Sequence, residues 1–128
     1  MKKTNIVKVD FTDLETRVIK DRPDYFMVTS PAYLTWLDNG VSHFNVLNTG
    51  DITNFASVPS GLRWLFNRNG KSRIPAAHHD NMYKNRRFTR KYCDQVFKAA
   101  LKKAGVNYFA CQSYYAAVRA FGWTRGTW

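Results

Sequence analysis

The sequence has few of the features that define several common classes of protein. Its 128 residues include two cysteines, Cys93 and Cys111, without zinc-knuckle spacing, so we expect buried thiols and no disulfide framework. No apolar run is long enough to span a membrane, and no apolar stretch follows the basic N-terminus. Repeats, linkers and low-complexity segments are absent. We therefore expect a single intracellular domain over residues 1–128, without a transmembrane segment.

Acidic residues are also scarce, and the imbalance of charge is local. The chain has 20 Lys and Arg against nine Asp and Glu, and residues 61–103 hold twelve of the basic and two of the acidic residues. Such an excess attracts polyanions such as nucleic acid or anionic lipid. One interpretation is a basic module that binds a polyanion or an acidic host protein, and the other is a solvated surface. The candidate polyanion-binding residues are Arg86, Arg87, Arg90 and Lys91.

The order of the expected elements predicts the fold class. Short β-rich runs lie between about residues 4 and 56, and Asp38-Asn39-Gly40 between two of them predicts a hairpin. Helical patterns follow between about 59 and 122, and Thr89 and Gly105 are good caps for the longest helix. Strands followed by helices predict an α+β domain, with an N-terminal antiparallel sheet with hairpins and a C-terminal bundle of three to four helices.

Only three histidines occur, and two are adjacent, at His78 and His79. On a helix, His79 and Tyr83 share a face, while Asp80 points about 100° away. Asp94 borders the apolar stripe of the next expected helix. If the two helices pack antiparallel, Asp94 can hydrogen-bond His79 and make it a general base, which leaves Asp80 for a metal ion or a substrate cation.

A purely structural interpretation stays open for the same residues. His79 fits a core histidine with Asp94 as its buried partner, and Asp94 is also spaced to pair with Arg90 or Lys98 on its own helix. We expect His78 to be a surface or packing residue and not a ligand. Cys93 lies on the apolar stripe, which argues against a nucleophilic role.

Four segments together resemble an uncharacterised family of small proteins of tailed phages and prophages. They share with it a Thr-Asp-Phe-Ala-Ser-Val-Pro-like segment, His-Asp-x-x-Tyr, Asp-x-x-Phe and a terminal aromatic helix. In this chain the segments are Gly50–Pro59, His79–Tyr83, Asp94–Phe97 and Ala117–Gly122. The resemblance implies a phage or prophage origin, and hence the host cytoplasm or the virion as the location and virion or tail proteins as partners. It implies no activity.

A second resemblance is local and suggests chemistry. The run from His79 to Lys84 is similar to the active-site helix of secreted calcium-dependent phospholipases of the A-two class. That similarity implies His79 as the water-activating base, Asp80 as a calcium ligand and Asp94 as the residue that orients His79. The glycine-rich calcium loop of those enzymes is absent, so Asn54 to Ser57 would have to supply the missing ligands.

The sequence therefore leads to a phage-encoded hydrolase as the main hypothesis, with a lipid ester, a cell-wall bond or a phosphoester as substrate. Catalysis is assigned to His79 and Asp94, a weakly bound Ca²⁺ or other divalent cation to Asp80, and substrate binding or support to Asn54, Ser57 and Tyr83. Asn54 replaces an Asp of the phage pattern, which predicts weak metal binding and an impaired or inactive site. The alternatives are a non-catalytic virion or tail protein and the basic binding module.

Overall fold

The computed structural model describes residues 3–53 and 70–121 and confirms the α+β class. Pro59, followed by Leu62, Leu65 and Phe66, predicts a short helix, and that segment lies outside the described residues, as does the aromatic run from Gly122 to Trp128. Six strands precede three helices in the described part of the chain. The strands are β1 (Ile6–Phe11), β2 (Thr16–Ile19), β3 (Arg22–Val28), β4 (Ala32–Asp38), β5 (Val41–Leu47) and β6 (Ile52–Thr53), and the helices are α2 (Arg73–Asn85), α3 (Arg90–Lys103) and α4 (Tyr108–Phe121).

The larger antiparallel sheet has the strand order β1-β4-β5. The predicted hairpin joins β4 to β5, and its register pairs Trp36 with His43 and Asp38 with Val41. Asn39 and Gly40 both have positive φ, at 51° and 81°, which is the backbone of the two-residue turn that matches the twist of paired strands. The inner face of this sheet carries Leu34 and Trp36, each 1% exposed.

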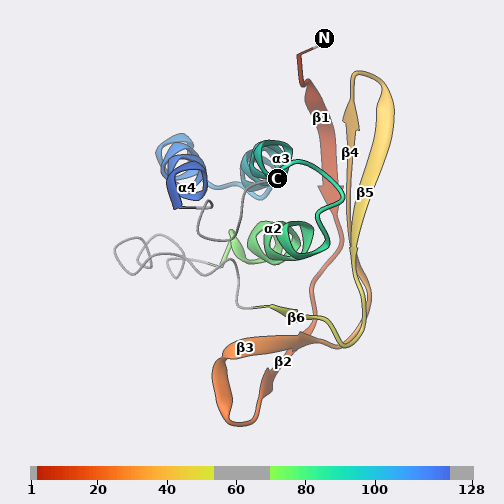
Figure 1. Cartoon of the computed structure of the whole chain (residues 1–128), viewed down its shortest axis with the longest axis vertical. Coiled ribbons are helices and arrows are strands. Elements are labelled where there is room, and N and C mark those ends of the chain that lie inside the picture. Colours follow the sequence, from red (N-terminus) through yellow and green to blue (C-terminus); the bar gives the residue numbers. More distant parts are fainter. Residues whose placement is uncertain (1–2, 54–69, 122–128) are drawn as a thin grey trace.

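The smaller antiparallel sheet has the order β2-β3-β6 and extends away from the helices (Figure 1). The run Arg22-Pro23-Asp24 is a typical turn signal and predicts a turn at these residues. That prediction is wrong, because the turn falls at Lys20 and Asp21 and β3 already begins at Arg22. Asp21 adopts a left-handed φ of 70°, which Asp tolerates better than most residues, so the chain reverses before Pro23.

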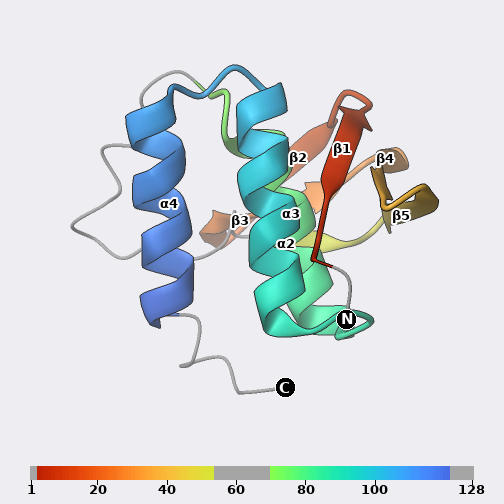
Figure 2. The ribbon, with the colours of Figure 1, turned by 90° about the horizontal axis from the view of Figure 1, so that it is seen from above.

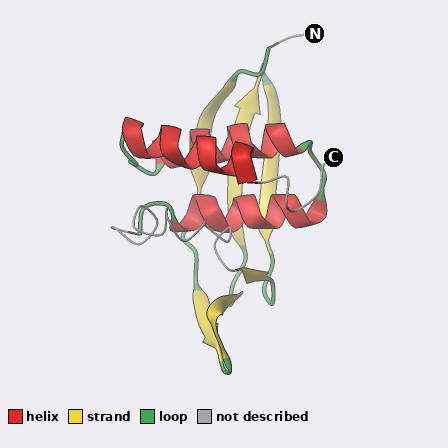
Figure 3. Ribbon diagram, turned by 60° about the vertical axis from the view of Figure 1, so that its left-hand side comes forward, coloured by secondary structure: helices red, strands yellow, loops and turns green. Residues whose placement is uncertain are grey.

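The helices form two further layers on one face of the larger sheet. Helices α2 and α3 lie against the sheet, and α4 lies beyond them (Figure 1). Seen from above, α3 and α4 run side by side (Figure 2), and the helices cross the strand direction (Figure 3). The short connection between α2 and α3 reverses the chain, with Arg86 at a φ of 54°. Consecutive helices are therefore close enough for side chains of all three to meet.

Helical spacing predicts a buried stripe in α3 that contains Cys93, Val96, Phe97, Ala100 and Leu101, and all five are buried. In α4 the same spacing predicts a stripe of Tyr108, Cys111, Tyr115 and Val118, which is confirmed only in part. Cys111 is buried, but Tyr108 is 76% exposed and Tyr115 and Val118 are half-buried. The other buried residues of α4 are Ala110, Tyr114 and Ala117. The helix is rotated because Tyr114 packs against Phe97 of α3.

No helix within residues 3–53 and 70–121 is long and apolar enough to cross a membrane, as the sequence led us to expect.

Candidate functional site

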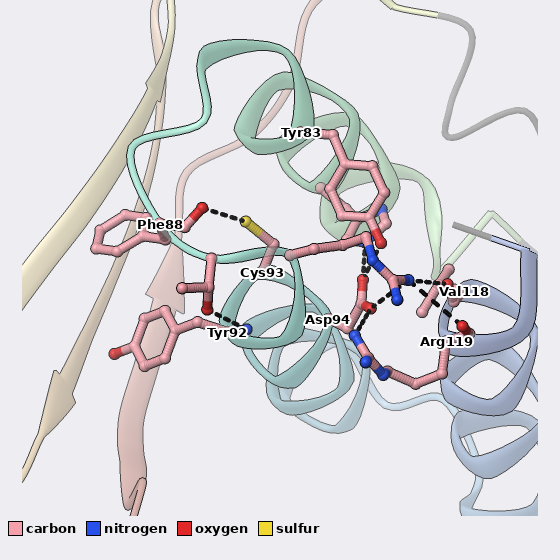
Figure 4. Close-up of polar contacts among 10 residues, drawn as sticks. Tyr83, Phe88, Tyr92, Cys93, Asp94, Val118 and Arg119 are labelled. Atoms are coloured by element: carbon pink, nitrogen blue, oxygen red, sulfur yellow. Dashed lines mark hydrogen bonds and ion pairs between the residues drawn. The ribbon is translucent and has the colours of Figure 1, made fainter. Parts of the chain in front are cut away.

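The Asp94 carboxylate lies at the centre of a polar cluster shared by three helices. His79 Nε2 of α2 lies 2.7 Å from Asp94 Oδ1, so the predicted hydrogen bond is present. The Tyr83 hydroxyl donates to the same oxygen. Arg119 of α4 donates from Nη1 to the other oxygen, Oδ2, at 2.8 Å. Figure 4 shows Asp94 between Tyr83 and Arg119.

A second guanidinium joins this cluster from the first turn of α3. Arg90 Nη1 lies 3.8 Å from Asp94 Oδ2, in one of the two same-helix pairings that the sequence left open. It also donates to the backbone carbonyls of Val118 and Arg119, both at 3.3 Å. Carbonyls in the last turn of a helix carry partial negative charge, so Arg90 stabilises the end of α4 while it neutralises Asp94. Lys98, the other expected partner, lies over the Tyr115 ring instead.

The surroundings of Asp94 keep it charged. The side chain is fully buried, and burial alone would raise its pKa. The hydrogen bonds from His79, Tyr83 and Arg119 outweigh that effect, and the net pKa is below its usual range. Tyr83 changes in the opposite direction, because burial and the neighbouring carboxylate both raise the pKa of its phenol. The cluster therefore holds an anionic carboxylate and a neutral phenol.

The His79 imidazole is fixed by aromatic rings as well as by its hydrogen bond. Its ring centroid lies 4.2 Å from that of Tyr83 and 4.5 Å from that of Phe97. The side chain is 3% exposed. Because Asp94 is anionic, the neutral imidazole carries its proton on Nε2 and donates it to Oδ1. Nδ1, on the opposite edge of the ring, is then the basic atom.

The Asp80 carboxylate points to a different set of partners. It is 1% exposed, and its Oδ2 lies 3.2 Å from the Lys84 ammonium. The same ammonium donates to the Ile52 carbonyl oxygen at 2.8 Å. Both oxygens suit a hard cation, but a lysine contacts both, and the described residues contain no group of three or more His, Cys, Asp or Glu arranged for a metal. The described donor set therefore does not fit a divalent cation.

The sequence left open whether His78 is a surface residue or a packing residue, and the structure shows that it is a packing residue. It is completely buried between α2 and β5, where the Asn45 side-chain amide donates to its Nδ1 at 2.9 Å. Burial lowers the pKa of His78 to about 3, so the ring is neutral. His43 also faces inward, but its ring lies in an aromatic group with Trp36, Phe88 and Tyr92.

The four residues proposed to bind a polyanion are not equivalent. Arg86, Arg87 and Lys91 are exposed at the connection between α2 and α3. Arg90 is 14% exposed and turned towards Asp94. Arg87 lies over the rings of Phe44 and Phe88, 5.2 and 5.5 Å from their centroids. Asn54 and Ser57, predicted to support the site, lie outside the described residues.

Two cations of the cluster region were not assigned to the site by the sequence, Arg119 and Lys84. Lys84 follows Asp80 by four residues, a spacing that predicts an ion pair on a helix. Arg119 offers no such signal, because spacing rules do not relate one helix to another. The only usable signal is indirect, since a carboxylate in an apolar stripe requires compensating charge.

A family model described as "Protein of unknown function (DUF1353)" matches residues 33–118, about two thirds of the chain. The match includes His79, Asp80, Tyr83, Arg90 and Asp94, and it stops one residue before Arg119. Searches of curated proteins and of solved structures found no match.

Proposed function

The chain belongs to this family of proteins of unknown function, so its activity must be inferred from the site, and we propose that it is a hydrolase in which His79 activates water. The observation that supports this proposal is the hydrogen bond between His79 Nε2 and Asp94 Oδ1, 2.7 Å long. A carboxylate in that position fixes the tautomer of the imidazole and raises the basicity of the opposite nitrogen.

The proposed reaction uses groups of this chain only. His79 Nδ1 takes a proton from water, and the hydroxide adds to the carbonyl carbon or phosphorus of an ester. The imidazolium that results is stabilised by Asp94 and returns the proton to the leaving oxygen. Tyr83 and Arg119 hold the carboxylate in place, and therefore act as positioning residues. Candidate substrates are a lipid ester, a phosphoester and a cell-wall bond.

A second candidate is favoured by the burial of the cluster. His79 is 3% exposed and Asp94 is fully buried, so substrate reaches Nδ1 only if neighbouring side chains move. A network that joins three helices also serves stability alone, as in a non-catalytic virion or tail protein. The two candidates make different predictions for variants of His79.

The test is hydrolysis of three chromogenic or turbidimetric substrates: a p-nitrophenyl carboxylic ester, bis-p-nitrophenyl phosphate and a cell-wall suspension. We expect turnover of at least one substrate, and a loss of about 10²–10⁴-fold in His79→Gln, which removes the general base. Tyr83→Phe keeps the imidazole and should retain part of the activity with a changed pH profile. His43→Gln replaces a histidine outside the cluster and should leave turnover unchanged.

One outcome would contradict the hydrolase proposal. If the natural protein hydrolyses none of the three substrates, and His79→Gln only lowers the urea midpoint, the cluster serves stability and the protein is a non-catalytic structural protein. Urea unfolding of each variant separates loss of chemistry from loss of fold.

Three further expectations from the sequence remain proposals. The phage or prophage origin rests on the four-segment pattern, and the genes beside this one would test it. The likeness to phospholipases of the A-two class is supported by the contact of His79 and Tyr83 with one carboxylate. A divalent cation at Asp80 would need ligands from beyond the described residues, such as Asn54 and Ser57.

A further inference from the structure

The outer face of the larger sheet carries aromatic side chains that no described helix covers. The described helices all lie against the opposite face (Figure 1). Along β4 and β5 the outward positions alternate with buried ones, and they include Tyr33, which is 47% exposed, and Phe44, which is 51% exposed. Thr35 pairs with Phe44, and Tyr33 pairs with Val46, so the two rings are diagonal neighbours on adjacent strands. They form an exposed aromatic pair that the proposed hydrolysis does not use.

A guanidinium borders this aromatic pair. Arg87, in the connection between α2 and α3, lies 5.2 Å from the centroid of the Phe44 ring and 5.5 Å from that of the Phe88 ring. Phe88 belongs to the inner face, where it packs against the core. The guanidinium therefore lies at the edge of β5, where the two faces of the sheet meet. Arg86 precedes it in the chain and Lys91 lies in the first turn of α3, and both are exposed.

The charge of this surface favours an anionic partner. Within the described strands of the sheet, the only acidic side chain at an outward position is Asp10 of β1, on the border opposite to Arg87. Its carboxylate accepts the Phe11 backbone N–H. A second copy of the chain facing this surface would bring its own positive charge, and like charges across an interface cost free energy.

Exposed rings beside basic side chains fit one class of polyanion better than the others. A single-stranded nucleic acid has free bases that stack on aromatic side chains, while its phosphates pair with Lys and Arg. In a duplex the bases are stacked on each other, so only the phosphates are offered to the protein. The exposed Tyr33 and Phe44 therefore favour a single strand over a duplex.

We propose that the outer face of β4 and β5 binds single-stranded nucleic acid. Bases stack on Tyr33 and Phe44, and the phosphates lie along Arg86, Arg87 and Lys91. Because every base has a flat π-face, binding of this kind has little sequence preference. The surface lies outside the cluster of His79 and Asp94, so the proposal goes beyond the proposed hydrolase activity and does not depend on it.

The test is a fluorescence anisotropy titration with labelled oligo-dT of about 10 nucleotides, which is within the site size of such surfaces. Tyr33→Leu/Phe44→Leu keeps apolar side chains on both strands but removes the rings. Its affinity should fall by roughly tenfold or more, because loss of one stacking ring costs about 5- to 100-fold. The slope of log K against log salt concentration should not change. Arg87→Gln should instead reduce the magnitude of that slope by roughly 0.7, the value for one phosphate of a single strand.

Matched controls separate stacking from charge. Phe44→Trp keeps a ring and should retain the affinity that Phe44→Leu loses. Tyr108→Leu/Phe109→Leu removes another aromatic pair, 76% and 69% exposed, at the start of α4 on the far side of the helices, and should bind as the natural protein does (Figure 1). An abasic oligonucleotide of the same length has phosphates without rings. It should bind the natural protein no more tightly than oligo-dT binds Tyr33→Leu/Phe44→Leu. Oligo-U of the same length distinguishes RNA from DNA.

Two results would overturn the proposal. One is equal affinity of the natural protein for oligo-dT and the abasic oligonucleotide, which decides the matter even if a variant does not fold. The other is unchanged affinity for oligo-dT in Tyr33→Leu/Phe44→Leu that is folded by circular dichroism. Sedimentation equilibrium tests the competing occupant: a dimer that becomes a monomer in this variant would assign the face to self-association and overturn the proposal as well. Hydrolysis is not measured, so a failure here is distinct from failure of the proposed function.

Discussion

At the scale of single residues, His78 is a buried imidazole whose surroundings exclude a positive charge. Its Nδ1 accepts from Asn45, and the Asn45 carbonyl accepts in turn from Asn85 at 3.5 Å, so the ring carries its proton on Nε2. Within the described residues Nε2 has no hydrogen-bond partner. Protonation would put a charge in the core and break the Asn45 bond, which agrees with a pKa of about 3.

His78 should therefore make the protein sensitive to mild acid. The unfolded chain takes up a proton on this imidazole below pH 6.5, its ordinary pKa, whereas the folded chain does so only near its pKa of about 3. The contribution of His78 to the free energy of unfolding is complete above pH 6.5. Below pH 6.5 it falls by up to about 1.4 kcal/mol per pH unit. Urea midpoints at pH 7.5 and 5.0 measure this fall. The fall in urea midpoint should be absent in His78→Gln and unchanged in His43→Gln. An equal fall in His78→Gln and in the natural protein would show that His78 does not cause the acid sensitivity.

The contact between His79 and Asp94 could be predicted from the sequence, whereas the role of Arg119 could not. His79 and Tyr83 share a helix face by spacing, and Asp94 borders a stripe on the next helix, so a short connection brings them together. Arg119 is placed by the packing of α4, whose rotation depends on Tyr114 against Phe97. Helix α4 has two faces with similar apolar composition, and its packing against α3 decides which of them is buried.

At the scale of elements, helix α3 connects the sheet to the other helices, and its first turn positions much of the site. The Thr89 hydroxyl accepts from the Tyr92 backbone N–H at 3.2 Å, which starts the helix at the predicted residue. Arg90 lies in this first turn, and Asp94 follows one turn later. Caps and turns were predictable because they depend on local chemistry, as at Thr89 and at Asn39-Gly40.

Thr89→Ala should destabilise the protein by about 1 kcal/mol, because the first turn of α3 loses the acceptor for one backbone donor. Urea unfolding measures the change. Thr89→Ser keeps the hydroxyl and is the matched control, with most of the stability retained. If serine costs as much as alanine, the threonine methyl and not the hydroxyl is responsible, and the capping argument fails.

At the scale of the whole molecule, some of the basic side chains lie on the surface and others pair with a buried carboxylate. Arg86, Arg87 and Lys91 are exposed at one end of the helical layer, while Arg90 and Arg119 face a buried carboxylate. A count of charges along the sequence cannot make that division, because it does not show which arginines point inward.

The exposed group should bind a polyanion weakly and without sequence preference. A labelled DNA duplex in a gel shift or anisotropy titration should bind at low salt and release at moderate salt. In a plot of log K for DNA binding against log salt concentration, replacement of Arg86, Arg87 and Lys91 by Gln should reduce the magnitude of the slope by roughly two to three. Lys102→Gln/Lys103→Gln alters the other end of α3 and should have little effect. No binding of the natural protein at low salt would refute the hypothesis.

The hydrogen bond from Trp36 Nε1 to the Tyr92 hydroxyl joins β4 to α3 across 56 residues, and this separation has a consequence during synthesis. The hairpin of β4 and β5 leaves the ribosome ahead of α3 by the time that synthesis of this stretch takes. At about 5–20 residues per second, the interval is roughly 3–11 s. For that time the cover of Leu34 and Trp36 is incomplete, because α3, which packs on them together with α2, has not yet emerged.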